Sequence, residues 1–147
     1  MSALRLRRGV LEESFQHLRD CGGGRNECVL YWCAAVDQPD LLVRVVHPVH
    51  RGWPAGYEVD SAWVTQFFLE LRRARQTVRV QVHTHPEHAG HSQTDDRFSL
   101  VPAPGFLSLV IPRYGMGRAG LQDTYLGRMR ADGTWTPVRP EEVLRGE

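Results

Sequence analysis

Apolar residues fall into short runs and stripes along the chain, and their spacing predicts its secondary structure. Residues 27–36 and 41–46 are apolar almost throughout, which is typical of strands covered on both faces. A turn of only a few polar residues separates them, so we expect an antiparallel pair. Residues 77–85 alternate and are rich in β-branched types, and residues 105–112 form another apolar run. Residues 3–8 fit a short edge strand.

Helical periodicity appears in other segments. Residues 9–19 place apolar side chains along one stripe, and a second stripe runs from Asp60 or Ser61, either of which fits a helix cap, to about Arg75. Short helices are expected at 94–100 and at 140–144. A closing hairpin around an Asp-Gly turn joins residues 124–130 to 134–138, and the segments 47–57 and 113–121, rich in glycine, proline or aromatic residues, are expected to be irregular.

Helices interleaved with hairpin-linked strands predict a fold of the α/β (α+β) class, a three-layer domain with a mixed sheet. The chain has 147 residues, the length of one domain, and neither a repeat nor a linker divides it. We therefore expect residues 1–147 to form a single domain.

The composition says more about the possible binding partners than about the fold. The hydrophobic share is 41%, the charged share 24% and the formal net charge +1, which provide no general attraction for nucleic acid or an anionic membrane. No apolar run is long enough for a signal peptide or a membrane span. The three cysteines, Cys21, Cys28 and Cys33, follow no zinc-ribbon spacing, so we expect reduced thiols in a cytoplasmic protein, with Cys28 and Cys33 on opposite faces of their strand.

The densest group of metal-capable side chains lies between residues 83 and 96. His83 and His85 end the strand predicted for 77–85, and side chains two residues apart on a strand share a face. After Pro86 and a short loop, Ser92 fits a helix N-cap, which lets Asp95 turn back toward the histidines. Two imidazoles and one carboxylate leave a fourth position for water, as in a catalytic zinc site.

Other residues compete for these roles. His88, His91 and Asp96 are alternative third ligands, although the Ser-x-x-Asp register favours Asp95. His47 and His50 lie on either side of Pro48, which disrupts regular spacing, so structural or surface roles are expected for them.

The order His-Thr-His-Pro, short loop, Ser-x-x-Asp resembles the motif of the JAB/JAMM (MPN) metalloprotease family. Here five residues separate Pro86 from Ser92, where many members have six. The resemblance implies a curved mixed sheet with flanking helices, the cytidine-deaminase-like JAB/MPN fold. It also implies zinc held by His83, His85 and Asp95, and a glutamate on an early strand, for which Glu27 is well placed.

Each residue then has an expected role. A bound zinc ion supplies an activated water as the nucleophile, and Glu27 is the general acid and base that moves its proton. The alternative bases, Glu12, Glu13 and Glu58, do not open an apolar strand as Glu27 does. Ser92 caps its helix and is also expected to stabilise the oxyanion.

The resemblance implies an isopeptidase or peptidase that cuts after the C-terminal glycine of a ubiquitin-like modifier, for processing or deconjugation. Compact bacterial members of this kind are associated with operons that encode such modifiers and their activating and conjugating enzymes. Two alternatives stay open, a non-catalytic module that binds the modifier and a zinc hydrolase of a small amide. The sequence contains neither the His-Glu-x-x-His of zincins nor the Pro-Cys-x-x-Cys of base deaminases.

Overall fold

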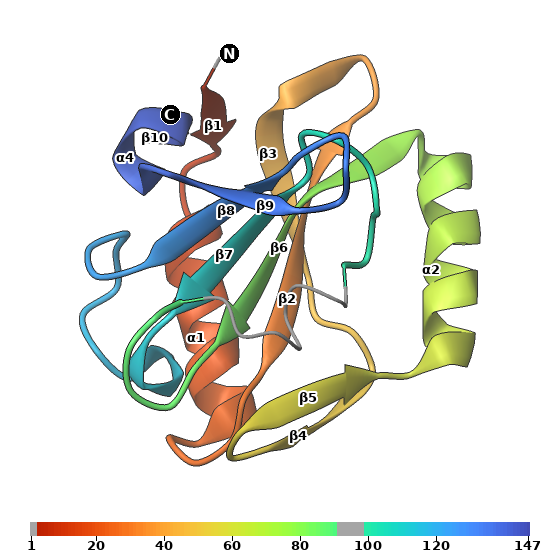
Figure 1. Ribbon diagram of the computed structural model, residues 1–147. Coiled ribbons are helices and arrows are strands. Elements are labelled where there is room, and N and C mark those ends of the chain that lie inside the picture. The colour runs from red at the N-terminus through yellow and green to blue at the C-terminus, as the bar shows by residue number, and fades with distance from the viewer. Residues whose placement is uncertain (1–2, 91–98) are drawn as a thin grey trace.

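The computed structural model describes residues 3–90 and 99–147, and a mixed sheet lies at its centre (Figure 1). Within these residues the sheet has eight strands in the order β10-β1-β3-β2-β6-β7-β8-β9, and a smaller sheet pairs β4 with β5. The strands are β1 (Leu4–Leu6), β2 (Val29–Ala35), β3 (Gln38–Val46), β4 (His50–Trp53), β5 (Gly56–Val59), β6 (Gln76–Thr84), β7 (Leu107–Ile111), β8 (Tyr125–Met129), β9 (Trp135–Val138) and β10 (Leu144–Gly146). Three neighbouring pairs are parallel, namely β1 with β10, β1 with β3, and β6 with β7.

Two helices cover opposite faces of the large sheet. The first, α1 (Val10–Gly22), packs into one apolar cluster, and α2 (Ser61–Ala74) packs into a second cluster on the other face. Two short helices complete the described elements, η1 (Arg113–Gly115) and α4 (Pro140–Val143). The helix, sheet and helix layers confirm the three-layer α+β class. Among the described helices, none has the length and apolar content needed to cross a bilayer.

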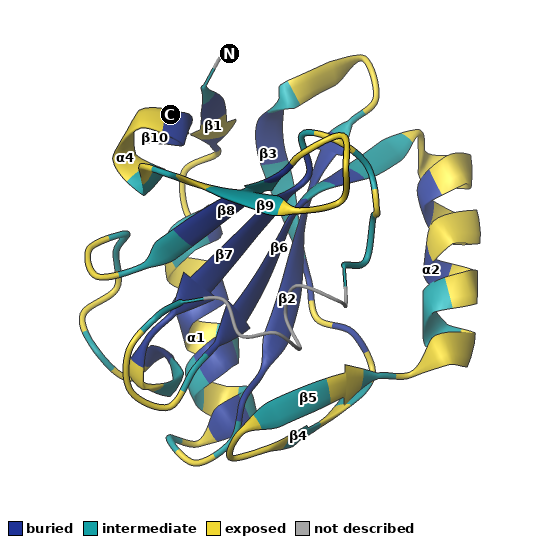
Figure 2. Ribbon diagram, viewed as in Figure 1, coloured by how far each residue is buried: buried dark blue, intermediate teal, exposed yellow. Residues whose placement is uncertain are grey.

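Strand β2 is buried along both faces, as its apolar sequence predicts (Figure 2). Leu30, Trp32 and Ala34 belong to the cluster under α1, while the alternate residues of the strand belong to the cluster under α2. Cys28 and Cys33 fall in different clusters, so they face opposite sides as expected. Burial raises the pKa of the Cys33 thiol to about 12, which keeps it protonated and unreactive.

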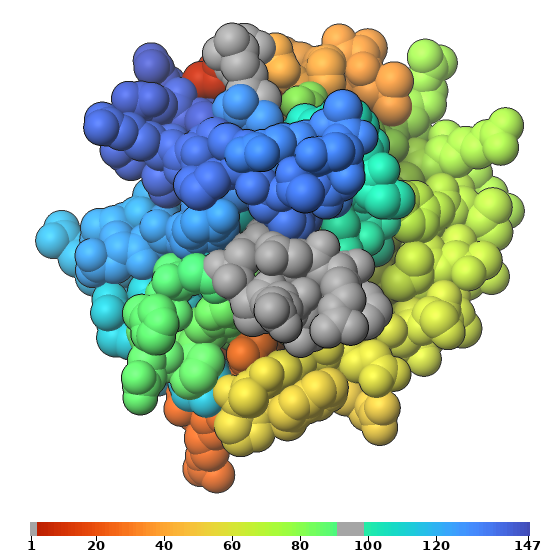
Figure 3. Space-filling model, viewed as in Figure 1, coloured from red at the N-terminus to blue at the C-terminus, as the bar shows by residue number. Residues whose placement is uncertain are grey.

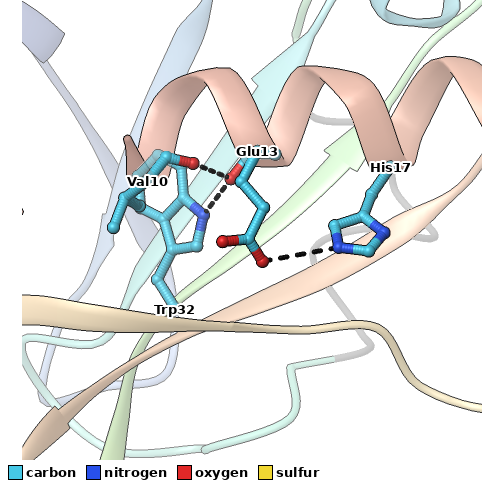
Figure 4. A network of polar contacts seen from close by, with 5 residues as sticks. Val10, Glu13, His17 and Trp32 are labelled. Atoms are coloured by element: carbon cyan, nitrogen blue, oxygen red, sulfur yellow. Dashed lines mark hydrogen bonds and ion pairs between the residues drawn. The ribbon is translucent and has the colours of Figure 1, made fainter. Parts of the chain in front are cut away.

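A buried hydrogen-bond chain fixes α1 to β2. The indole nitrogen of Trp32 donates to Ser14 Oγ over 2.8 Å, and Ser14 Oγ donates to the Val10 carbonyl over 2.7 Å (Figure 4). Glu13 and His17 form an ion pair on the same helix at 3.4 Å, but both are largely accessible to solvent. The Trp32 indole is fully buried, so its N–H requires a partner, and Ser14 supplies it.

Several local predictions are wrong. Residues 4–6 form a strand, but β1 lies between β10 and β3 and is not an edge. Residues 50–59 form the β4–β5 hairpin instead of an irregular segment, and β10 was not expected. The turn before β3 is earlier than predicted, because the strand begins at Gln38. Cys21 and Cys28 are joined as a disulfide, which contradicts the expectation that all three thiols are reduced.

The Trp32–Ser14 hydrogen bond makes a testable contribution to stability. Ser14→Ala should lower the free energy of unfolding by about 1–3 kcal/mol, because the buried indole N–H loses its acceptor. Denaturant unfolding measures this change. Thr65→Ala, at an exposed position of α2 where the hydroxyl bonds a helix carbonyl, is the control and should cost less than about 0.5 kcal/mol. Equal stabilities for the two variants would contradict the role given to Ser14.

Candidate metal centre

The antiparallel ladder between β2 and β6 assembles the candidate site. Val29 lies opposite His83, and the strands continue beyond this pair, because Thr84 N donates to the Cys28 carbonyl over 3.1 Å. Cys28 N in turn donates to Thr84 Oγ1 over 2.9 Å. Glu27 lies two residues before Val29, and alternation along the chain puts it on the face of the sheet that carries His83.

The two imidazoles lie side by side on that face. The ring centroids of His83 and His85 are 5.1 Å apart and their planes are inclined by 58°. His83 is fully buried, whereas His85 is half-buried at the end of the strand. Side chains in this arrangement can direct one nitrogen each toward a shared ion, as the His-x-His spacing predicts.

Glu27 is buried, with only 5% of its surface exposed. The β4–β5 hairpin holds its main chain, since Glu27 N donates to the Trp53 carbonyl over 3.0 Å. Gly52 makes this approach possible, because a Cβ at position 52 would overlap the carbonyl oxygen of Glu27. A carboxylate at this depth carries a desolvation cost, so Glu27 is not a solvated strand end.

Neighbouring segments form the walls of the site. The Tyr57 ring of β5 lies 5.4 Å from the His83 ring, centroid to centroid. On the other side, His85 N donates to the Ile111 carbonyl and Tyr114 N donates to the His85 carbonyl, each over 2.9 Å. Tyr114 adopts a left-handed backbone conformation with φ of 55°, which is costly for a residue with a side chain and is common near functional sites.

These walls also contact each other. The Tyr114 hydroxyl donates to the Pro54 carbonyl in the turn of the β4–β5 hairpin over 2.9 Å. Figure 3 shows the hairpin, in yellow, and the loop of residues 86–90, in green, on the same face of the molecule. The segments 47–57 and 113–121 therefore meet beside the histidines.

The other predicted site residues fall into two groups. Ser92 and Asp95, with the alternatives His91 and Asp96, lie outside the described residues, as does most of the helix predicted for 94–100. The alternatives that the structure describes do not join the site as bases or ligands. His88, Glu12 and Glu13 are exposed, and Glu58 is exposed and forms an ion pair with Arg51 at 3.4 Å.

The described donors fit a zinc ion. Imidazole nitrogen suits zinc, and two imidazoles on one face with a buried carboxylate nearby are the donors of a catalytic site that takes its remaining ligands from elsewhere. His83 is fully buried, with the Tyr57 ring against it, and electrostatic interactions are stronger where water is excluded.

A second group of metal-capable residues was missed by the sequence analysis. The ligand atoms of its members are all within 4.8 Å of one another: Cys21, Cys28, His47 and His50. The structural or surface role expected for the two histidines stays a prediction, and the structure adds that both lie beside cysteine sulfurs. Burial lowers the pKa of His47, and the neighbouring His50 and His17 imidazoles lower it further.

Comparison with known proteins finds similarity both in sequence and in structure. No family model matches the chain. The probable metalloprotease y4jG of Sinorhizobium fredii is 28% identical over 133 residues, which cover 87% of this chain and 82% of that protein. A solution structure from Desulfitobacterium hafniense is 19% identical with a TM-score of 0.68, and covers 98% of this chain and 94% of its own.

Two further structures decide the fold. A JAB1/MPN domain protein from Archaeoglobus fulgidus is 13% identical with a TM-score of 0.56, and both chains are covered completely. A structure described as JAMM, a metalloprotease-like zinc site in the proteasome and signalosome, is 12% identical with a TM-score of 0.53, and 99% of each chain is covered. The chain has the JAB/MPN fold. The resemblance to the JAB/JAMM family that the motif predicted is confirmed.

The close approach at Gly52 gives a prediction for this candidate site. Gly52→Ala should force the β4–β5 hairpin away from Glu27, because the new Cβ overlaps backbone rather than a flexible side chain. Overpacking of this kind costs about 1–3 kcal/mol, measurable by denaturant unfolding. Gly146→Ala is the control, since a Cβ there meets nothing within 4 Å. If Gly52→Ala is as stable as the control, the hairpin does not constrain Glu27.

Proposed function

We propose that this protein is a zinc metalloprotease of the JAMM isopeptidase type, which cuts after the C-terminal glycine of a ubiquitin-like modifier. The observation that carries the proposal is the convergence of His83, His85 and buried Glu27 where β2 and β6 meet. Similarity to a probable metalloprotease and to a JAMM zinc-site structure supports the reaction class.

The residues divide the chemistry among them. His83, His85 and Asp95 are the proposed zinc ligands, and Ser92 the proposed oxyanion donor. A zinc ion held by these residues would supply a water activated for attack at neutral pH. Glu27 would take up a proton from the attacking water and pass it to the leaving amine, a role that requires a carboxylate beside the ligands and not among them. The buried setting of Glu27 favours such proton transfer, because few waters compete for it.

Substrate binding is proposed for the segments beside the histidines. A modifier that ends in Gly-Gly has a thin extended tail, which can add as a strand to an exposed sheet edge. Strand β5 belongs to a two-stranded sheet, so it is an edge, and its Tyr57 lies against His83. The tail would then run between β5 and the segment 113–121, with the terminal glycine next to Glu27. Trp53, which is 44% exposed, is available to cover the tail.

A cellular location and protein partners are proposed for the reaction. We place the reaction in the cytoplasm, where the modifier and its activating and conjugating enzymes are the expected partners. Neither nucleic acid nor a membrane has a part in it, which agrees with the net charge of +1.

The role of Glu27 can be tested by Glu27→Gln. The amide keeps the shape of the side chain but cannot accept a proton, so turnover should fall by about a hundredfold or more while zinc content is unchanged. Glu58→Gln, at an exposed carboxylate, is the matched control and should retain both turnover and zinc content. Loss of zinc from Glu27→Gln would make Glu27 a ligand and contradict the division of roles.

The ligands can be tested by His85→Ala, which should lose one zinc equivalent per chain relative to the unsubstituted protein, measured by elemental analysis. His88→Ala is the control, because His88 is exposed in the adjoining loop. Unchanged zinc in His85→Ala would remove the basis for a metal centre at this position.

The substrate can be tested with a ubiquitin-like protein that ends in Gly-Gly, fused to a reporter. Intact mass should show a single cut directly after the second glycine, and the zinc-depleted protein should not make it. A cut elsewhere, or none with zinc bound, would contradict the substrate class and favour a small amide substrate or a binding role.

A further inference from the structure

Cys21, Cys28, His47 and His50 are brought together from three separate segments of the chain. Cys21 lies near the end of α1, and Cys28 directly precedes β2. His47 follows β3 and His50 begins β4. The cluster therefore joins α1, β2 and the connection from β3 to β4 at one point.

Two sulfur–nitrogen distances in the cluster have the spacing of metal ligands, although the two sulfurs are bonded to each other. Cys21 Sγ lies 3.3 Å from His50 Nε2, and Cys28 Sγ lies 3.4 Å from His47 Nε2. Zinc–sulfur bonds of about 2.3 Å and zinc–nitrogen bonds of about 2.0 Å at tetrahedral angles separate sulfur from nitrogen by roughly 3.5 Å. Both sulfur–nitrogen distances therefore match the distance between two ligand atoms of a tetrahedral zinc site.

The orientation of His50 agrees with ligation. Its Nδ1 lies 3.0 Å from the Pro48 carbonyl oxygen, which can only accept a hydrogen bond. The proton is therefore on Nδ1, and the lone pair of Nε2 is directed toward the sulfur of Cys21. A carbonyl that fixes the tautomer in this way is the usual support of a metal-binding histidine.

We propose that the protein has a second metal site, a closed structural zinc site whose four ligands are Cys21, Cys28, His47 and His50. Four protein ligands leave no position for substrate or water, so this site has no catalytic role. Two thiolates balance the charge of the zinc ion, and both ligand types suit zinc.

The disulfide and the zinc site are alternative states of the same two sulfurs, because metal binds cysteine as the thiolate. The proposed site forms in the reduced protein. Its ligands are only partly covered, with Cys28 buried, Cys21 and His50 half-buried and His47 exposed, so a zinc ion can reach them from solvent.

The site would stabilise the segment that carries Glu27. Cys28 follows Glu27 directly, and Cys28 N is bonded to Thr84, which lies between the two histidines of the candidate metal centre. A zinc ion at Cys28 would thus fix the start of β2 to α1 and to the β4–β5 hairpin, behind the candidate centre. The zinc-binding proposal itself does not depend on the proposed protease function.

Cobalt substitution tests the site directly. The protein, reduced with a phosphine and kept in it, is stripped of metal and titrated with Co²⁺. Thiolate-to-cobalt charge-transfer absorption in the near ultraviolet should develop, and Zn²⁺ should remove it. The candidate centre at His83 and His85 contains no proposed thiolate, so it cannot produce this band. Absence of the band in the reduced protein would overturn the proposal.

Variants assign the band to its ligands. Cys21→Ser should abolish most of the band, whereas Cys33→Ser, the matched control at the buried cysteine outside the cluster, should retain it. A band that is lost only in Cys33→Ser would also overturn the proposal. Should Cys21→Ser fail to fold, the partly exposed His50→Ala serves instead, with an affinity for Zn²⁺ lowered by about tenfold or more.

Zinc content separates the two centres. The reduced protein should bind about two zinc ions per chain, and Cys21→Ser and His85→Ala should each lose about one. If Cys21→Ser retains the full zinc content, the second site does not exist. If His85→Ala keeps the full zinc content while Cys21→Ser loses one ion, the proposed centre at His83 and His85 is wrong and the cysteine–histidine site is supported.

Discussion

The antiparallel pairing of β2 with β6 is the contact on which the rest of the structure depends. Its register places Val29 opposite His83, and Glu27 lies two residues before Val29 on the same face of the sheet. A shift of one residue would turn Glu27 to the face covered by α1 and leave the histidines without a carboxylate. Apolar side chains bury β2 on both faces, and this burial fixes the register.

The two faces of β2 carry different groups of metal-capable side chains near its start. Glu27 lies on the face with the histidines, and Cys28, the next residue, lies on the face with His47 and His50. The β4–β5 hairpin connects them, because His50 begins β4 and the Trp53 carbonyl at the end of β4 binds Glu27 N. The candidate catalytic carboxylate is therefore held by a strand, a hairpin and the cysteine–histidine cluster together.

Much of the fold could be predicted because its signals are local. Alternation and apolar runs give β2, β3 and β6, the cap at Asp60 gives α2, and the two-residue period puts His83 and His85 on one face. The elements that could not be predicted depend on contacts between distant segments of the chain. Strand β10 exists through parallel pairing of residues 144–146 with residues 4–6, which no short window reveals.

The candidate sites show the same contrast between local sequence signals and contacts of distant segments. Glu27 was predicted because the resemblance to the JAB/JAMM family implies a glutamate on an early strand, and Glu27 opens an apolar strand; the structure buries it. The cysteine–histidine cluster was missed because its spacings, Cys-x6-Cys and His-x2-His around Pro48, match no common zinc motif. The cluster forms only when α1, β2 and the β3–β4 connection are packed together. The sequence offered one signal: the two cysteines and the two histidines lie close to the ends of predicted helices and strands.

The central claim is a zinc ion held by His83 and His85, with Glu27 beside it and not bound to it. Anomalous diffraction from crystals of the zinc-loaded protein at the zinc absorption edge tests this most directly. The predicted result is a peak about 2.0–2.1 Å from one nitrogen of each imidazole, with both Glu27 oxygens farther away than a ligand bond. Zinc-loaded crystals with no peak between the two imidazoles, or with a Glu27 oxygen bonded to the ion, would contradict the account.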